Sequence, residues 1–171
     1  MALIVETGVG LVDAESYISV ADATAYHLKM GNQVAWALVG DNATMEAMLR
    51  RATNYMRGRY YGMWVGVMTV FTQRLDWPRI GVWTRSGSGL ASNIVPGEVQ
   101  DACAELALRA ASASLLPDTS QSVKREKVGP IEVEYDAYSP IAPTFTSIDE
   151  MLAAFLIAGA RPGVSVPLMR A

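Results

Sequence analysis

Residues 43–60 read Ala-Thr-Met-Glu-Ala-Met-Leu-Arg-Arg-Ala-Thr-Asn-Tyr-Met-Arg-Gly-Arg-Tyr. Apolar and aromatic side chains recur in this stretch at three- and four-residue spacing, which is typical of one buried face of an α-helix. Asp41 or Asn42 can cap the first turn. The stretch therefore predicts a long central helix, whose buried stripe consists of Met45, Met48, Leu49, Ala52, Tyr55, Met56 and Tyr60.

The residues before the central helix predict a shorter helix. Ser19 and Asp22 resemble a capping box, with Asp in place of the usual Glu, at the start of a helix over 20–30. Gly31 is a good residue to end that helix. The apolar residues around Trp36 are expected to form a short connector.

Two helices are expected after the central one. Pro96 suits the first turn of an alanine-rich helix over 96–115, whose small side chains let neighbouring backbones approach closely. Ser147 and Glu150 form a second capping box, which predicts a helix over 148–160.

The intervening segments complete the predicted architecture. Residues 61–95 lose the helical period and hold five glycines and three of the four tryptophans. Residues 123–128 and 131–135 flank Gly-Pro, and the second arm alternates apolar and acidic side chains, which predicts a β-hairpin. We therefore expect a mainly α fold, a small helical bundle of four to five helices with an inserted β-hairpin and extended terminal arms. A single domain would cover residues 1–160, with an extended C-terminal tail over 161–171.

Composition excludes several classes of protein. The chain has 171 residues, of which 51% are hydrophobic and 18% charged, too apolar for a wholly disordered chain. Fourteen Lys and Arg stand against seventeen Asp and Glu, which argues against a strongly basic nucleic-acid module. The sequence has no apolar run long enough to span a bilayer and no secretory signal at its start, so we expect no membrane contact and synthesis in the cytoplasm.

Candidate catalytic or metal-binding groups are few. A single Cys and a single His exclude an internal disulfide and any site with paired histidines or several cysteines. His27 is expected to be an ordinary half-buried residue, and Cys103 a small core residue of the alanine-rich helix. Gly8-Val-Gly10 lacks the strand-to-helix context of a dinucleotide site. We therefore expect no enzyme activity, no metal and no cofactor.

Charge is unevenly distributed along the chain. Between residues 46 and 85 seven arginines stand against two acids, whereas acids outnumber bases in the remainder. Such a polarised chain suits head-to-tail contact between copies, because a positive side can meet a negative one. The alternative is that the arginines lie on solvated helix faces and pair locally.

The same arginines raise the question of nucleic-acid binding. Arginines interleaved with aromatic residues are what single-strand binding proteins use. The alternative is that the aromatic residues belong to the core and the arginines bridge to acids of a neighbouring copy, and we favour it at this point. The interleaved residues are Arg50, Arg51, Arg57, Arg59, Arg74 and Arg79 with Tyr55, Tyr60, Tyr61, Trp64 and Trp77.

The carboxyl end is unusually apolar. After Glu150 the predicted helix has almost no polar surface, and a helix that is apolar all round is buried all round. We expect a partner to cover the part that the domain cannot. The tail contains Pro162 and Pro167, cannot be helical through them, and is expected to be held by a partner.

Several motifs, in the same order along the chain, resemble those of a known family. They are Val12-Asp-Ala-Glu-Ser-Tyr-Ile-Ser19, Trp36, Leu49-Arg-Arg-Ala-Thr-Asn-Tyr55, Leu75-Asp-Trp-Pro-Arg79, Val95-Pro96 and Val128-Gly-Pro-Ile-Glu-Val-Glu-Tyr135. Together they make the chain similar to the head-tail connector proteins of tailed phages, also called head-completion or adaptor proteins. That family is often described as DnaT-like single-stranded-DNA-binding proteins.

The resemblance implies a structural virion protein. Copies of the chain would form a ring, expected to be twelvefold, between the portal protein and the next neck or tail-completion protein, around a channel through which DNA passes without sequence-specific binding. The residues expected to dock on the partner are Leu152, Phe155, Leu156, Ile157, Leu168 and Met169. The residues expected between copies are Arg50, Arg57, Arg59, Glu132 and Glu134. The alternative function is that of a DnaT-like single-stranded-DNA-binding protein.

Overall fold

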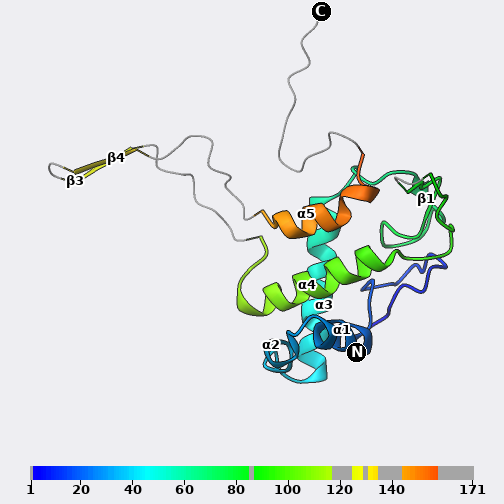
Figure 1. Ribbon diagram of the computed structural model, residues 1–171, viewed down its shortest axis with the longest axis horizontal. Coiled ribbons are helices and arrows are strands. Elements are labelled where there is room, and N and C mark those ends of the chain that lie inside the picture. The colour runs from blue at the N-terminus through cyan, green and yellow to red at the C-terminus, as the bar shows by residue number, and fades with distance from the viewer. Residues whose placement is uncertain (1, 85–86, 117–124, 129–130, 135–143, 158–171) are drawn as a thin grey trace, which may run out of the picture.

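The computed structural model describes residues 2–84, 87–116, 125–128, 131–134 and 144–157, and it is mainly helical (Figure 1). The predicted fold class, a small helical bundle with a small β-hairpin, is confirmed. In chain order the elements are α1 (Val20–Lys29), α2 (Gln33–Ala37), α3 (Asn42–Arg59), β1 (Val67–Met68), β2 (Arg79–Ile80), α4 (Gly97–Ser112), β3 (Arg125–Val128), β4 (Ile131–Glu134) and α5 (Thr146–Leu152), followed by a 3₁₀ turn at Ala153–Phe155.

Helix α3 is the central element of the fold. In Figure 1 it runs from the end of the molecule that holds α1 and α2 to the end that holds α5, and α4 packs across it. Leu49 and Met56 of α3 are fully buried, as are Ala102 and Ala107 of α4. The small alanine side chains leave room for the two backbones to approach, as the sequence predicts.

The starts of the first helix and of the central helix, both predicted from local capping, are confirmed. The Ser19 hydroxyl accepts a hydrogen bond from the Asp22 backbone N–H at 3.1 Å and donates to the Asp22 carboxylate at 2.6 Å. The Asp41 carboxylate accepts from the Thr44 N–H at 2.8 Å. Each bond satisfies a donor that the first helical turn would otherwise leave unpaired.

The expected connector around Trp36 is instead the short helix α2, so that prediction is wrong. Trp36 is buried, its indole Nε1 donates to the Thr24 hydroxyl at 2.9 Å, and its ring lies 4.7 Å from the His27 ring between centroids. These contacts with α1 hold the chain in a helical turn that its local sequence signals only weakly.

Helix α5 is shorter than the predicted helix over 148–160. It ends at Leu152, and after the 3₁₀ turn Leu156 forms an isolated antiparallel bridge with Trp64. The backbone N–H of Val65 donates to the Phe155 carbonyl at 2.9 Å, and that of Ile157 donates to the Met63 carbonyl at 2.8 Å. These long-range hydrogen bonds compete with further helical ones and draw the chain into an extended form.

The predicted cap of this helix is also not formed. The helix begins at Thr146 with Phe145 as its N-cap, which makes no side-chain capping bond, and Ser147 lies inside the first turn. The Ser147 hydroxyl accepts a hydrogen bond from the Arg109 guanidinium at 3.1 Å. The Phe145 ring packs against Tyr55 at 5.5 Å between centroids, so tertiary contacts of an aromatic residue fix where the helix begins.

The aperiodic segment from residue 61 onward is held by a cluster of aromatic rings. Trp64 and Trp77 meet edge to face at 5.7 Å, and Trp77 meets Phe155 in the same way at 5.5 Å. The guanidinium of Arg79 donates to the backbone carbonyls of Val65 at 2.7 Å and Gly66 at 2.6 Å. Strands β1 and β2 pair antiparallel beside this cluster.

The N-terminal arm is wrapped around one buried carboxylate. Glu6 is 4% exposed and accepts hydrogen bonds from the backbone N–H groups of Gly8, Gly10 and Leu11 at 2.9, 2.9 and 2.8 Å. Gly8 has a φ of +100°, and an added Cβ would collide with the Asn93 carbonyl oxygen. The arm is therefore tied both to itself and to the segment before α4.

The predicted hairpin forms between β3 and β4, which pair antiparallel. The register places Arg125 opposite Glu134 and Lys127 opposite Glu132, the pairing of basic and acidic positions that the sequence suggests. The side chains of Glu132 and Glu134 lie outside the description, as do the whole of Leu168 and Met169 and the tail over 161–171.

Candidate nucleic-acid interface

The arginines of α3 turn largely toward their own chain. Arg50 forms an ion pair with Glu15 at 2.9 Å and a second with Glu46 at 3.4 Å. The hydrogen bond from Arg50 holds the pKa of the Glu15 carboxyl below its ordinary value. The charge of Arg50 is therefore compensated within its own chain, and its expected contact with a neighbouring copy stays a prediction.

Arg57 and Arg59, the other two arginines expected between copies, are half-buried at the carboxyl end of α3. Burial raises the pKa of the Asp76 carboxyl, and the charges of Arg57 and Arg79 act in the opposite sense. The charge of Arg57 thus acts on an acid of its own chain.

The structure divides the residues expected to dock on a partner into two groups. Leu152 and Phe155 are buried in the protein's own core, at 0% and 3% exposure, so they offer no surface for docking. Leu156 is half-buried, and Ile157 is 48% exposed. The chain thus covers the core face of this helix itself, and the expectation that a partner covers the remaining apolar surface stays a prediction.

The aromatic residues that are interleaved with these arginines also divide into two groups, buried and exposed. Tyr55, Tyr60, Trp64 and Trp77 are all buried, as the core interpretation predicts. Tyr61, in contrast, is 80% exposed.

Sequence reasoning missed two further exposed aromatic residues, Phe71 at 94% and Trp83 at 66%. Both lie in the segment that lacks periodicity, where no pattern distinguishes a core aromatic from a surface one. One sequence signal could have indicated that Trp83 is exposed: it lies between Gly81 and a glycine-rich stretch that ends at Gly89. In the structure Trp83 forms an isolated antiparallel bridge with Gly89.

We call the exposed large side chains of residues 61–83 the loop surface. Two contacts hold part of the backbone of this segment: Val67 pairs with Ile80 across β1 and β2, and the Thr69 hydroxyl donates to the Ser92 carbonyl at 2.9 Å. In Figure 1 the turns of this segment surround β1, at the end of the molecule away from α1 and α2. Its members are Tyr61, Val67, Met68, Phe71, Ile80 and Trp83.

Charge on this segment is mainly positive. Arg74 is exposed and follows Phe71 closely in the chain, whereas the single acid of residues 61–84, Asp76, is half-buried. The Gln73 side chain donates to the Leu75 and Pro78 carbonyls at 2.8 and 3.1 Å, which fixes the turn that presents Arg74. Arg74 itself lies near Glu15 of the N-terminal arm, whose pKa its charge helps to lower. Exposed rings and an exposed cation on one segment are the elements from which base-stacking surfaces are built.

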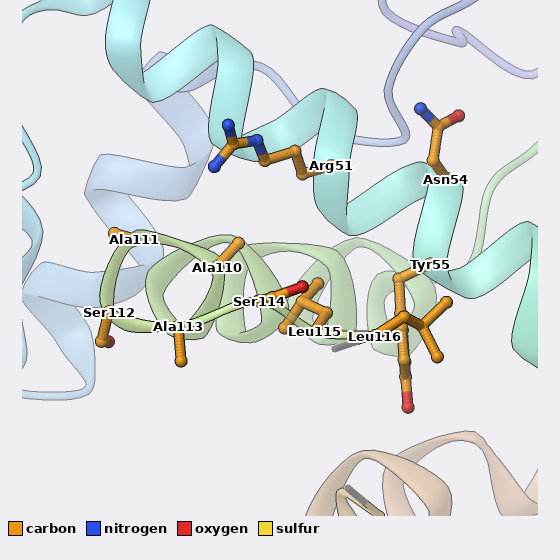
Figure 2. Close-up of a pocket in the computed structure, with 10 residues that line it drawn as sticks. All are labelled: Arg51, Asn54, Tyr55, Ala110, Ala111, Ser112, Ala113, Ser114, Leu115 and Leu116. Atoms are coloured by element: carbon orange, nitrogen blue, oxygen red, sulfur yellow. The ribbon is translucent and has the colours of Figure 1, made fainter. Parts of the chain in front are cut away.

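A pocket of about 630 Å³ lies between α3 and the end of α4 (Figure 2). Arg51 and Asn54 line it from α3, Tyr55 forms part of its wall, and residues 110–116 close the other side. The lining holds one cation and no acid.

Comparison with protein families shows to which family the chain belongs. A family model described as "Putative DnaT-like ssDNA binding protein" matches residues 1–171. The chain belongs to this family. No curated protein and no solved structure matches the chain.

Membership of the DnaT-like family confirms one part of the resemblance seen in the sequence. The comparisons contain nothing that supports the head-tail connector role. The family description agrees instead with the alternative function, single-stranded-DNA binding. The loop surface is therefore the candidate site of this DnaT-like protein.

The remaining reactive groups of this DnaT-like chain are built into its core. Cys103 is fully buried, its Sγ lies 3.4 Å from the Thr53 hydroxyl, and burial raises the pKa of its thiol. His27 is fully buried, with Nε2 3.1 Å from the Ala104 carbonyl oxygen, and burial lowers its pKa. The core position expected for Cys103 is confirmed, and His27 is more deeply buried than expected.

Within residues 2–84, 87–116 and the shorter described ranges, no three His, Cys, Asp or Glu side chains gather as a metal site would require. No helix among these residues has the length and apolar character needed to cross a membrane.

Proposed function

We propose that the chain binds single-stranded DNA through the loop surface. The observation that carries the proposal is the exposure of three aromatic side chains, Tyr61, Phe71 and Trp83, on a segment whose exposed charge is that of Arg74. Every base has a π-face, so such a surface binds single strands with little sequence preference. The DnaT-like family match supports the same function.

The proposed affinity is modest and comes from stacking more than from charge. The chain carries a formal charge of −3, and its arginines are largely engaged by their own chain. A single phosphate contact through the exposed Arg74 would give a slope of log K against log salt of about −0.7 for single strands. We therefore expect binding that is clear at low salt and only moderately weaker at physiological salt.

Trp83 provides a direct measurement. Trp36, Trp64 and Trp77 are at most 3% exposed, whereas Trp83 is 66% exposed. A base stacking on Trp83 should quench its emission, so titration with oligo-dT should lower tryptophan fluorescence. In Trp83→Phe the quenching should disappear while anisotropy of a labelled oligonucleotide still reports nearly normal affinity, because Phe also stacks.

Removal of the ring distinguishes stacking from charge. Trp83→Ala should weaken binding by about 5- to 150-fold, the equivalent of 1–3 kcal/mol for one stacked base. The matched control is Leu116→Ala, which removes a side chain that is 55% exposed at the far end of α4. Equal affinity of Trp83→Ala and wild type, or absence of oligonucleotide binding at low salt, would refute the proposal.

The ring adaptor of a phage neck is the second candidate function. The specific observation that favours it is Ile157, which is 48% exposed beside the half-buried Leu156, so an apolar strip remains at the carboxyl end. Under this proposal the chain assembles with itself, with the portal protein and with the next neck protein in the virion. Ring particles in electron micrographs, together with weak oligonucleotide binding, would favour it over the DNA-binding function.

A further inference from the structure

The pocket between α3 and the end of α4 exists because the last turn of α4 is built from small residues (Figure 2). Residues 110–114 read Ala-Ala-Ser-Ala-Ser, and the backbone becomes extended at Ala113, where φ is −155° and ψ is 163°. The space that larger side chains would fill stays open. Its volume of about 630 Å³ is within the usual range of small-molecule sites.

The apolar wall of this pocket is held in place by the core. Tyr55 is 3% exposed, and its ring contacts the Phe145 ring at 5.5 Å between centroids. Leu115, which follows the extended turn, is 7% exposed. These two side chains supply a fixed contact area of the kind that holds the body of a small ligand.

Two polar groups of α3 line the same pocket and lack a strong partner within the described part of the chain. The Arg51 guanidinium makes a weak contact with the Met48 Sδ at 3.9 Å and forms no ion pair with a described carboxylate. The Asn54 amide makes no hydrogen bond to a described residue. Because residues three apart are neighbours on a helix, the two groups can act on one ligand.

The polar groups of the pocket select the chemistry of that ligand. Among the described residues that line the pocket, Arg51 is the single charged one, so an anion is favoured. The guanidinium fork binds one phosphate or carboxylate through two parallel hydrogen bonds. The Asn54 amide and the Ser114 hydroxyl add donors and acceptors, which a hydrocarbon body would leave unpaired. The pocket therefore suits an organic anion whose body is a ring with polar edges.

We propose that this pocket binds a nucleoside monophosphate or a small molecule of the same chemistry. Its phosphate or carboxylate group lies on Arg51, and its ring lies against Tyr55 with a polar edge toward Asn54. The site is separate from the loop surface, because no residue of the loop surface lines it and Figure 1 shows the carboxyl end of α4 away from β1. The two proposals therefore do not depend on each other.

Titration of the isotopically labelled full chain with thymidine monophosphate, followed by NMR, tests the proposal. The side-chain N–H signals of Arg51 and Asn54 report on the site directly. Both should shift and saturate, with a dissociation constant on the order of 0.1 mM for a ligand of about twenty non-hydrogen atoms in an open site. Thymidine lacks the phosphate and should bind about tenfold or more weakly. Hexanoate, an anion with a hydrocarbon body, should also bind more weakly.

Two variants with matched controls assign the contacts. Arg51→Gln should weaken binding of thymidine monophosphate about tenfold or more and leave thymidine binding unchanged, because the lost contact is with the phosphate. Lys29→Gln removes an exposed cation from α1 and should change neither. Asn54→Asp keeps the shape of the side chain but places an anion beside Arg51, so it should weaken binding of the monophosphate. Asn42→Asp, the same change at an exposed position at the other end of α3, should not.

The outcomes separate this proposal from the DNA-binding function. All four replaced side chains are exposed, so thermal unfolding of the variants should match wild type. Absence of saturable shifts at Arg51 and Asn54 would overturn the proposal, and so would equal affinity for thymidine or hexanoate. Loss of monophosphate binding in Trp83→Ala would place the nucleotide on the loop surface and would also overturn it. Oligonucleotide binding is measured separately by anisotropy, so either proposal can fail alone.

Discussion

Replacement of Glu6 by Gln isolates the hydrogen bonds that fold the N-terminal arm. The Glu6 Oε1 atom accepts from Gly8 and Gly10, and Oε2 accepts from Leu11. The side chain is buried, so water does not substitute for these bonds. A glutamine has the same shape, but it must turn an NH₂ group toward at least one of the three N–H donors.

The size of the loss in free energy of unfolding depends on which hydrogen bond the substitution removes. The best orientation keeps the amide oxygen on Gly8 and Gly10 and leaves the Leu11 N–H without its acceptor. Hydrogen bonds to charged groups contribute about 1.5–3 kcal/mol each, and the two that remain would fall to the neutral value of about 1 kcal/mol. Because Leu11 is only half-buried, we expect a loss of about 2–3 kcal/mol. For a chain of this size that corresponds to a fall of about 4–12 °C in Tm.

Urea unfolding and amide hydrogen exchange together measure this loss. If the arm unfolds with the rest of the molecule, Glu6→Gln lowers the free energy of unfolding. If it opens locally, the amides of Gly8, Gly10 and Leu11 lose protection while the global value stays the same. The control is Asp13→Asn, an exposed carboxylate of the same segment, which should change stability by less than about 0.5 kcal/mol. Unchanged stability and unchanged protection in Glu6→Gln would refute the assigned role.

Two further predictions concern pH. Burial lowers the pKa of His27, so as pH falls the unfolded chain binds a proton on this histidine before the folded chain does. The free energy of unfolding should therefore be unaffected by His27 above about pH 6.5. Below that pH it should decline by at most about 1.4 kcal/mol per pH unit. Since His27 is the sole histidine, urea unfolding at pH 7.5 and 5.5 should show this decline in wild type and not in His27→Gln. The pKa of Glu15 is lowered, mainly by its hydrogen bond from Arg50, so its contribution is present above the ordinary value of 4.5 and is lost below it. The Tm should therefore fall less steeply between pH 5 and 3 in Glu15→Gln than in wild type. Equal slopes of Tm against pH in the two proteins would contradict the pairing of Glu15 with Arg50.

Local signals sufficed for the main helices. The caps at Ser19 and Asp41 and the three- and four-residue spacing of the central helix depend on neighbours in sequence, and both starts are observed where they were predicted. The end of α5 depends instead on Met63 and Val65, about ninety residues away, whose backbone groups pair with the chain after Leu152. A capping-box pattern carries no information about such a competitor, so the predicted helix ran too far.

The candidate site was harder to predict for a related reason. In a helix or strand, periodicity tells which side chains face the core, and it correctly assigned Tyr55 and Tyr60. In residues 61–83 there is no period, and Trp77 and Trp83 look equivalent in sequence although the first is fully buried and the second is not. What separates them is the packing of Trp77 between Trp64 and Phe155, which only the folded chain reveals.

The side chains of the loop surface are distinct from those that hold its segment in place. The exposed rings of the loop surface can be replaced at little cost to stability. Other rings, which are buried, and the Arg79 guanidinium hold the segment in place. Substitutions that weaken the loop surface should therefore separate binding from folding cleanly.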